Sequence, residues 1–295
     1  MNNFIISACS TADLPLKFFK EHNIPCLYYS FIINDKVYSD DLGTTMSYEE
    51  FYNRIDEGAM PTTSQVNVDT YVNTFEPYLK DGLDILHLSF SSGLSGSCGS
   101  AFSAAEILKE KYPDRKIYVI DTLAASLGYG LLVNYAVSKK DAGEDIDKIY
   151  NWINENKLNL NHWFTVNDLQ HLKRGGRLGS GAALLGTLLH IKPVLHVDNK
   201  GKLIPVSKTA GRKKSLNELV SRMEEMIVNP DGQEIFISHS NCIEDANYVA
   251  ERIKSHIPGI KRVFINMIGP VIGSHTGIGT VAVFFLGKNR EEFKD

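Results

Sequence analysis

The stretch DILHLSFSSGLSGSCGSAFSAAEIL, residues 84–108, indicates the fold class of this chain. It starts with an apolar run typical of a strand, continues through a serine- and glycine-rich loop, and ends in a segment with helical spacing. A strand that leads through such a turn into a helix directs the free backbone N–H groups of the helix toward one point. The positive end of the helix dipole lies there too, so the stretch predicts a site for a small anionic or polar head group.

The composition of the loop limits the kinds of ligand that we expect it to bind. It lacks the lysine of a P-loop, and its glycines do not have the dinucleotide-binding spacing, so we expect no triphosphate there. Six serines supply hydroxyl groups instead: Ser89, Ser91, Ser92, Ser95, Ser97 and Ser100. Serine and glycine also cap helices and fill tight turns where nothing binds. From this stretch alone, the anion site and the plain turn are about equally good interpretations.

Strands and helices alternate on both sides of this stretch. Buried strands are expected at 4–7, 24–33, 84–90 and 116–121, and helices at 47–58, 67–82, 100–112 and 127–143. The helix at 47–58 opens with Ser47 and carries Glu50 three residues later, which is a capping box. This alternation predicts an α/β fold whose N-terminal sheet is largely parallel, with helices on both faces.

The polar stretch NENKLNLNH (154–162) is the best candidate for a domain boundary, which divides the chain into domains at 1–158 and 159–295. Segments 191–198 and 202–208, joined by the turn NKG, predict a β-hairpin. Helices at 215–228 and 244–257 and strands near 235–240, 262–268 and 280–287 complete the pattern. They predict a second α/β domain with a mixed sheet, and a ligand pocket between or within the two domains.

Composition excludes several classes of protein. The 295 residues carry a net charge of −4, with 43% hydrophobic and 22% charged residues, as in ordinary globular proteins, so no basic field would attract nucleic acid. The N-terminus lacks the basic region of a signal peptide, and the apolar runs are too short to span a bilayer. Four dispersed cysteines without a CxxC pair argue against a metal site and indicate free thiols in the cytoplasm.

Four further segments share the character of the opening loop. PTTSQV (61–66) is rich in hydroxyls but by itself fits a plain helix cap, and ALLGTLLHIKPVLHV (183–197) fits core better than a pocket wall. In HLKRGGRLGSG (171–181), arginines beside bare backbone suit either a phosphate or acidic partner, or a solvated turn. In IGPVIGSHTGIGT (268–280), His275 lies in a glycine-rich loop, where it could donate to an anion or move a proton.

Together these segments resemble a known family. TTSQ, SSGLSGS, DTLAASLGYGLLV, LKRGGRLG, LHIKPVL and GSHTGIG occur in one order along the chain, preceded by STADLP at 10–15. In that order they are similar to the DegV family, known as the fatty-acid-binding subunits of bacterial fatty acid kinase, the FakB proteins. Each motif is weak alone, but six in register cover nearly the whole chain.

The resemblance implies a two-domain protein that encloses a long-chain fatty acid such as palmitate and has no cofactor. The family's threonine, serine and histidine that bind the carboxylate match Thr63, Ser95 and His275. A hydrophobic chain suits such a site, because each buried methylene contributes about 0.8 kcal/mol, while neutral hydroxyls fix the position of the carboxylate.

The resemblance also implies partners. A separate kinase would supply ATP and metal and form the acyl phosphate, a downstream acyltransferase would use it, and no residue of this chain would be catalytic. The basic segment of the family matches Arg174 and Arg177, and an arginine that contacts the kinase most nearly matches Arg212. These three are the candidate contacts with kinase or phosphate, and transient membrane contact is compatible with the role.

Four positions depart from the family's pattern: Cys9, Val66, Cys98 and Ile278. None removes a predicted ligand of the carboxylate. They leave open which acyl chain fits, and whether Cys9 and Cys98 alter the shape of the pocket.

Two other functions fit parts of the sequence. Gly93-Leu94-Ser95-Gly96-Ser97 nearly forms the G-x-S-x-G turn of a serine hydrolase, with His275 as base and Asp121 as its partner, but position 97 is serine instead of glycine. A sugar- or nucleotide-phosphate binder would use the basic loops but leaves the apolar 183–197 segment without a role. Fatty-acid binding is the interpretation that we carry forward.

Overall fold

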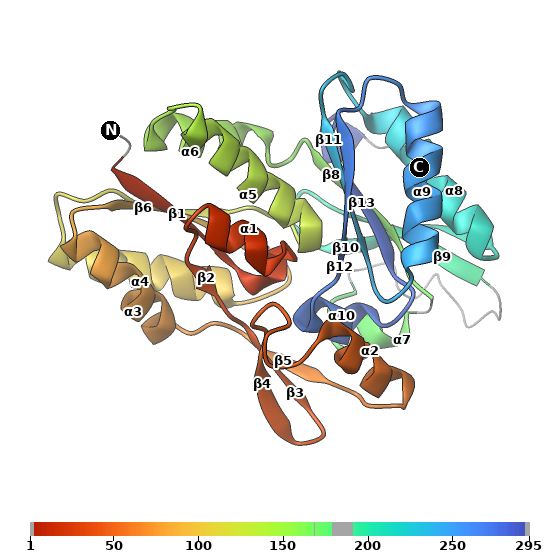
Figure 1. The fold of residues 1–295 in the computed structure, drawn as a ribbon, viewed down its shortest axis with the longest axis horizontal. Coiled ribbons are helices and arrows are strands. Elements are labelled where there is room, and N and C mark those ends of the chain that lie inside the picture. The colour runs from red at the N-terminus through yellow and green to blue at the C-terminus, as the bar shows by residue number, and fades with distance from the viewer. Residues whose placement is uncertain (1–2, 168, 179–190, 293–295) are drawn as a thin grey trace.

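The computed structural model describes residues 3–167, 169–178 and 191–292 of the chain, and its strands form a four-stranded, a three-stranded and a six-stranded sheet (Figure 1). Helices pack on the two larger sheets, so the predicted α/β class with a parallel N-terminal sheet and a mixed C-terminal sheet is confirmed. The predicted division at residues 158 and 159 falls just before the first strand of the six-stranded sheet and stays a prediction.

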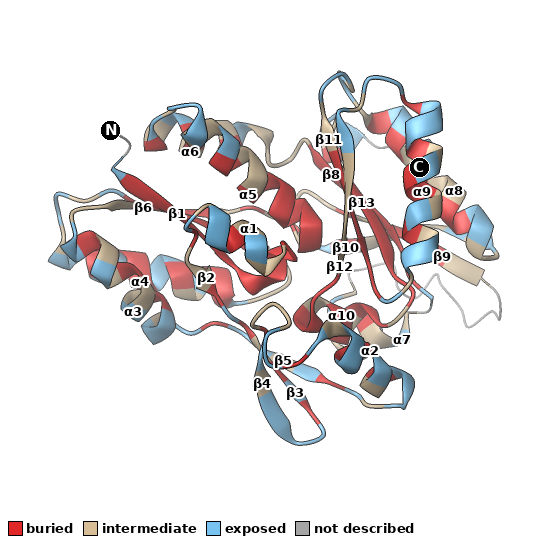
Figure 2. Cartoon of the chain, in the orientation of Figure 1, coloured by how far each residue is buried: buried red, intermediate tan, exposed pale blue. Residues whose placement is uncertain are grey.

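The four-stranded sheet is parallel throughout, in the order β2-β1-β6-β7. Its strands are β1 (Phe4–Cys9), β2 (Cys26–Leu27), β6 (Asp84–Ser89) and β7 (Ile117–Asp121). The chain then forms α3 (Val68–Lys80) and α4 (Ser97–Lys111) on one side of this sheet and α5 (Ser126–Asp141) and α6 (Ile146–Asn156) on the other (Figure 1). All residues of β1 are buried because helices cover both faces (Figure 2).

The single strand predicted at 24–33 is wrong. The chain leaves the parallel sheet after β2 and enters a separate antiparallel sheet in the order β4-β3-β5, which projects from the molecule (Figure 1). Its strands are β3 (Ser30–Ile33), β4 (Lys36–Ser39) and β5 (Thr62–Ser64). The helix cap predicted within 61–66 is wrong as well: Asn67 caps α3 and accepts from the backbone N–H of Thr70 at 2.8 Å.

Three helical elements precede β5 in the chain, two of them short. They are α1 (Leu16–Glu21), the 3₁₀ turn η1 (Ser10–Ala12) and α2 (Tyr48–Asp56). The predicted capping of α2 is confirmed for Ser47, whose side chain accepts from the backbone N–H of Glu50 at 3.1 Å.

The six-stranded sheet has the order β10-β9-β8-β13-β11-β12, and only β11 and β12 run parallel. Its strands are β8 (Leu160–Thr165), β9 (Ile191–Val197), β10 (Leu203–Ala210), β11 (Glu234–His239), β12 (Arg262–Met267) and β13 (Val281–Leu286). The predicted hairpin of β9 and β10 is confirmed. β8 was not predicted, because its start lies in the polar stretch taken as a domain boundary.

The helices α8 (Arg212–Met226) and α9 (Ile243–His256) cover one face of the six-stranded sheet (Figure 1). The opposite face packs toward the four-stranded sheet: Phe164, Ala282 and Phe284 belong to the same apolar core as β1, β6 and α5. Because one core spans both sheets, residues of both halves line the space between them. The short η3 turn (Arg290–Glu292) ends the described chain.

Two more short helices lie near this junction: α7 (Gln170–Arg174) and α10 (Pro270–Thr276). Loops were expected at 171–181 and 268–280, because both segments are rich in glycine. The structure shows instead that Arg174 and His275 lie in the last turns of short helices whose glycines allow close packing.

Candidate functional site

A cavity of about 310 Å³ lies between one face of the six-stranded sheet and the segments that follow β6 and β7 of the four-stranded sheet. Its wall is mainly apolar and includes side chains from both halves of the chain, among them Phe90, Phe164, Leu172, Val197, Leu203 and Val271. The predicted segment 183–197 is described only from residue 191 onward, where Val197 lines the cavity; 183–190 lies outside the described residues. The apolar wall suits a hydrocarbon chain.

The six-stranded sheet provides a regular floor for this cavity. Ala282 and Phe284 of β13 face it, and their partners in register on β8 are Phe164 and His162. Residues two apart on a strand point to the same face and are about 6.8 Å apart. The apolar floor therefore extends along β8 and β13, and polar side chains lie at one end of the cavity.

Thr63 and His275 form the centre of that polar end. They lie 212 residues apart, on β5 and α10, and Thr63 Oγ1 is 2.8 Å from His275 Nε2. Burial, helped by the neighbouring Arg177, Arg174 and His171, lowers the pKa of His275 to about 4. The imidazole is therefore neutral near pH 7, and it offers one N–H donor instead of a charge.

Ser95 reaches the same end of the cavity from the loop before α4. Its hydroxyl oxygen accepts from the backbone N–H of Ser97 at 3.2 Å and from the hydroxyl of Tyr29 at 3.4 Å. Of the six serines noted in this segment, Ser95 lines the cavity, whereas Ser91 is buried and donates to Gly201 O at 2.8 Å. Of the six serines in the loop that was expected to bind a head group, one therefore lines the cavity.

Arg177 completes the polar end. Its Nε donates to Leu94 O at 3.1 Å and its Nη1 to Gly175 O at 2.5 Å, which ties the segment after α7 to the serine loop. We call Thr63, Ser95, His275 and Arg177 the carboxylate end. Thr63, Ser95 and His275 are the residues predicted to bind a carboxylate, and Arg177 was predicted as a contact with kinase or phosphate. The structure brings all four to one cavity.

A second, smaller hollow of about 170 Å³ adjoins the carboxylate end and shares Thr63, Arg177 and His275 with it. Arg174 lines this hollow from α7, and its Nη2 lies 3.1 Å from His171 Nδ1. Two arginines beside exposed backbone favour an anion, and phosphate is the anion for which bidentate guanidinium groups are best suited.

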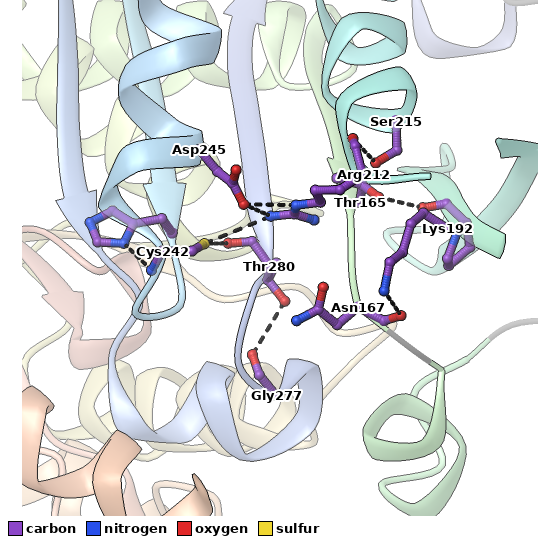
Figure 3. A network of polar contacts seen from close by, with 11 residues as sticks. Thr165, Asn167, Lys192, Arg212, Ser215, Cys242, Asp245, Gly277 and Thr280 are labelled. Atoms are coloured by element: carbon purple, nitrogen blue, oxygen red, sulfur yellow. Dashed lines mark hydrogen bonds and ion pairs between the residues drawn. The ribbon is translucent and has the colours of Figure 1, made fainter. Parts of the chain in front are cut away.

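Arg212 lies elsewhere, at the start of α8 (Figure 3). Its Nε donates to Asp245 Oδ2 at 2.7 Å, and its Nη2 lies 3.8 Å from Cys242 Sγ. The Cys242 thiol donates to Thr280 O at 3.3 Å, in the turn that follows α10. Arg212 is not among the residues that line either cavity, and the structure gives it an internal ion pair.

The opposite end of the cavity is also polar, and the sequence analysis missed it. Ser126 donates to the buried Asp13 carboxylate at 2.5 Å, and its oxygen lies 3.0 Å from Ser238 Oγ. On the other side of β13, His162 Nε2 accepts from the backbone N–H of Ala125 at 3.4 Å. Ser126, Ser238 and His162 line the cavity, and Asp13 contacts Ser126 from outside this lining; we call these four residues the inner end. Asp13 and Ser126 lie in quoted motifs, but nothing in the motifs indicated this contact.

Two buried carboxyl groups flank the start of α10. Asp13 Oδ1 accepts from the backbone N–H of Gly269 at 3.0 Å, and a Cβ placed on Gly269 would lie 3.5 Å from Asp40 Oδ1. Burial raises the pKa of Asp40 to about 7, which the Ser10 hydroxyl and the Val271 N–H only partly offset, and neither Asp40 oxygen has a partner with full hydrogen-bond geometry. Burial also raises the pKa of Asp13 well above its ordinary value.

The geometry does not assemble the site of the alternative function, a serine hydrolase. The ring of His275 bonds to Thr63, and Asp121 Oδ1 accepts from the backbone N–H groups of Ser92 and Leu123 at 3.1 Å. Within the described part of the chain, no Ser95–His275 or His275–Asp121 hydrogen bond forms.

The departures from the family's pattern do not reshape the cavity directly. Cys9 is buried beside Tyr71, and neither Cys9 nor Cys98 is among the lining residues. Among residues 3–167, 169–178 and 191–292, no group of three or more His, Cys, Asp or Glu is arranged to hold a metal ion. Of the helices in those same ranges, none has the length and apolar character to cross a bilayer.

Known proteins resemble this chain over its whole length. A family model described as DegV, a family of uncharacterised proteins, matches residues 4–288. A DegV domain-containing protein of Clostridium perfringens is 50% identical over 291 residues, 99% of this chain and 100% of the relative. A DegV domain-containing protein of Streptococcus pyogenes is 35% identical and covers 97% of this chain and 99% of its own.

Solved structures share the fold. A DegV family protein from Thermus thermophilus, described as fatty acid binding, has a TM-score of 0.88 at 27% identity, with 97% of this chain and 99% of the other covered. A fatty acid binding protein of the family from Streptococcus agalactiae has a TM-score of 0.85 at 29% identity, with 98% and 100% covered. DegV from Bacillus subtilis, also described as a fatty acid binding protein, has a TM-score of 0.84 at 27% identity, with the same coverage.

Proposed function

The chain belongs to the DegV family, and we propose that it binds one long-chain fatty acid in the cavity that both halves of the chain line. The observation that carries the proposal is an apolar cavity whose lining includes Thr63, Ser95 and His275, the three residues predicted to bind a carboxylate. Structural relatives that are described as fatty acid binding support it.

The affinity of such a ligand would come mainly from its chain. At about 0.8 kcal/mol for each buried methylene, ten methylenes contribute roughly 8 kcal/mol before the costs of binding. Phe164, Ala282 and Phe284 form a flat floor along which the chain can lie. The polar groups would then determine which end of the ligand enters where.

The carboxylate end suits an anion that must later react. Thr63 and Ser95 offer hydroxyls, and the neutral His275 holds the Thr63 hydroxyl in place through their hydrogen bond. Arg177 adds a positive charge close by. Hydrogen bonds to a charged group contribute about 1.5–3 kcal/mol each, enough to fix the register of the chain. No buried ion pair is needed, which limits the cost of desolvation.

The wider role that we propose is to present this carboxylate to a separate ATP-dependent fatty acid kinase. The smaller hollow beside Thr63 and His275, with Arg174 and Arg177, would receive the phosphoryl group or an acidic part of the kinase. The kinase supplies ATP and metal, and an acyltransferase would consume the acyl phosphate for phospholipid synthesis. In this scheme the chain acts as a binding subunit and contributes no catalytic residue.

Native mass spectrometry of the purified protein, followed by organic extraction, tests the binding proposal. We expect one long-chain fatty acid per chain. A protein that remains empty after incubation with palmitate contradicts the proposal.

The kinase role has its own test. Loaded protein with ATP and Mg²⁺ should form no acyl phosphate until the cognate kinase is added. Acyl phosphate formed without the kinase would contradict the binding-subunit role while leaving fatty-acid binding intact.

A further inference from the structure

Gly175 lies directly against the ring of His275. Its backbone is in the ordinary right-handed helical region, with φ −72° and ψ −9°, so the conformation does not require glycine. The lack of space does require glycine, because a Cβ at this position would overlap His275 Nδ1 and lie 3.0 Å from Cε1. His275 Nδ1 is buried and has no hydrogen-bond partner among the described residues.

The same glycine contacts a second member of the carboxylate end. Its carbonyl oxygen accepts from Arg177 Nη1 at 2.5 Å, and Arg177 in turn donates to Leu94 O, next to Ser95. One glycine thus borders the histidine with its Cα and holds the arginine with its oxygen.

The packing between α7 and α10 is reciprocal. Gly277, just after α10, approaches the ring of His171 on α7, where a Cβ would lie 2.5 Å from Cδ2. Each helix therefore presents a histidine to a glycine of the other. Gly277 has a φ of +71°, so its backbone also favours glycine, whereas at Gly175 the close approach is the only constraint.

We propose that Gly175 is a positioning residue of the carboxylate site: the absence of its side chain lets the His275 ring lie against α7 and direct Nε2 at Thr63. This inference rests on the proposed function, since it explains how that site is held. If Nε2 carries the ring proton and donates to Thr63 Oγ1, the Thr63 hydroxyl is free to donate to a carboxylate. The other tautomer would bury an unpartnered N–H at Nδ1, which costs more than an unpartnered acceptor.

Gly175→Ala tests the proposal in full-length protein with palmitate as the probe. We expect palmitate affinity to fall at least tenfold, and the pKa of His275, followed by NMR titration, to rise from about 4 toward 6.5 as the ring moves into solvent. Two controls isolate the contact. Gly99→Ala lies in α4 with nothing near the added methyl, and Gly176→Ala strains the neighbouring backbone without touching His275; neither should move the His275 pKa.

A double-mutant cycle with His275→Ala gives the second readout. In that background the overlap with the ring is gone and the added methyl keeps only a 3.2 Å approach to His171 O, so Gly175→Ala should change palmitate affinity less than twofold. The double variant should fold even if Gly175→Ala alone does not, and such a rescue would itself support the proposal.

Equal losses from Gly175→Ala in both backgrounds, or an unchanged His275 pKa in the single variant, would overturn the inference. Palmitate affinity that survives His275→Ala unchanged would contradict the proposed carboxylate site instead, and the NMR titration would still decide whether Gly175 positions the ring.

Discussion

The two ends of the cavity are both polar, but their polar groups are arranged differently. At the inner end, the donors and acceptors of Asp13, Ser126 and Ser238 are directed at one another and at the start of α10. At the carboxylate end, Thr63 and His275 share one hydrogen bond and retain capacity for a ligand. Buried hydroxyls therefore indicate a binding site only where their hydrogen bonds are not all used within the protein.

The largest effect that separates the two ends is expected from Thr63→Ala combined with Ser95→Ala. Each change removes a hydrogen bond to the ligand's carboxylate, about 1.5–3 kcal/mol, so palmitate affinity should fall by two orders of magnitude or more. Titration calorimetry measures the affinity, and thermal unfolding should stay within a few degrees of wild type.

Ser92→Ala serves as the matched control, because Ser92 is exposed in the same loop and lines neither cavity. It should leave the affinity unchanged. Wild-type affinity in the Thr63/Ser95 double variant would mean that the ligand's head group lies elsewhere.

The next effect concerns Asp40, near the inner end, and depends on pH. Its pKa rises from 3.8 to about 7 on folding, so the folded state holds the proton more tightly and loses stability as pH rises from about 4 to 7. That difference corresponds to roughly 4 kcal/mol. Asp40→Asn should therefore stabilise the protein by a few kcal/mol at pH 8 and change little at pH 4.

Chemical denaturation at the two pH values measures this difference. Asp56→Asn, at an exposed position of α2, is the control and should give the same small change at both. A destabilised Asp40→Asn variant at pH 8 would show that the charged carboxylate is needed at the start of α10.

Ser126→Ala probes the inner end through stability. It leaves the buried Asp13 carboxyl without one of its two donors, which should cost about 1–3 kcal/mol of unfolding free energy. Ser138→Ala, an exposed serine in the same helix, should change stability by less than about 0.5 kcal/mol. If Ser126→Ala weakened palmitate binding as strongly as Thr63→Ala while leaving stability intact, the assignment of the two ends would have to be reversed.

The smallest effect is expected outside the cavity, at Arg174. Arg174→Glu should leave palmitate binding intact and raise the apparent KM of the kinase for the loaded protein several-fold, more at low ionic strength, because exposed charges mainly steer association. Lys254→Glu on α9, with the same change in charge, is the control. Arg212→Ala should instead reduce stability, since it breaks the ion pair with Asp245; a salt-dependent KM effect in that variant would restore Arg212 to the kinase surface.

Local patterns predicted the parts of the fold that depend on neighbouring residues. The strands β1, β6 and β7, the helices α4 and α5 and the β9–β10 hairpin are set by runs of apolar residues, and the start of α2 by its cap Ser47. The three-stranded sheet escaped prediction because Thr62–Ser64 is a strand only through its pairing with β3, which no local pattern contains. β8 was missed for a related reason: its polar residues Asn161 and His162 are buried by long-range contacts.

The candidate site also has a part that local motifs predicted and a part that they did not. Thr63, Ser95, His275 and Arg177 were found through motifs and prove to line one cavity. The hydrogen-bond distances at this site depend on residues that lie far apart in the sequence. The same holds for the packing of Gly175 on His275 and for the ion pair of Arg212. The inner end was missed because the motifs that contain Asp13 and Ser126 do not indicate that these two side chains meet.

The most direct test of the account is ¹³C NMR of palmitate labelled at its carboxyl carbon and bound to the protein. We predict one bound carboxyl signal that shifts strongly in Thr63→Ala and in His275→Ala. The signal should stay in place in Ser238→Ala at the inner end. A carboxyl signal that ignores the first two variants and moves in the third would place the head group at the wrong end of the cavity and contradict the central claim.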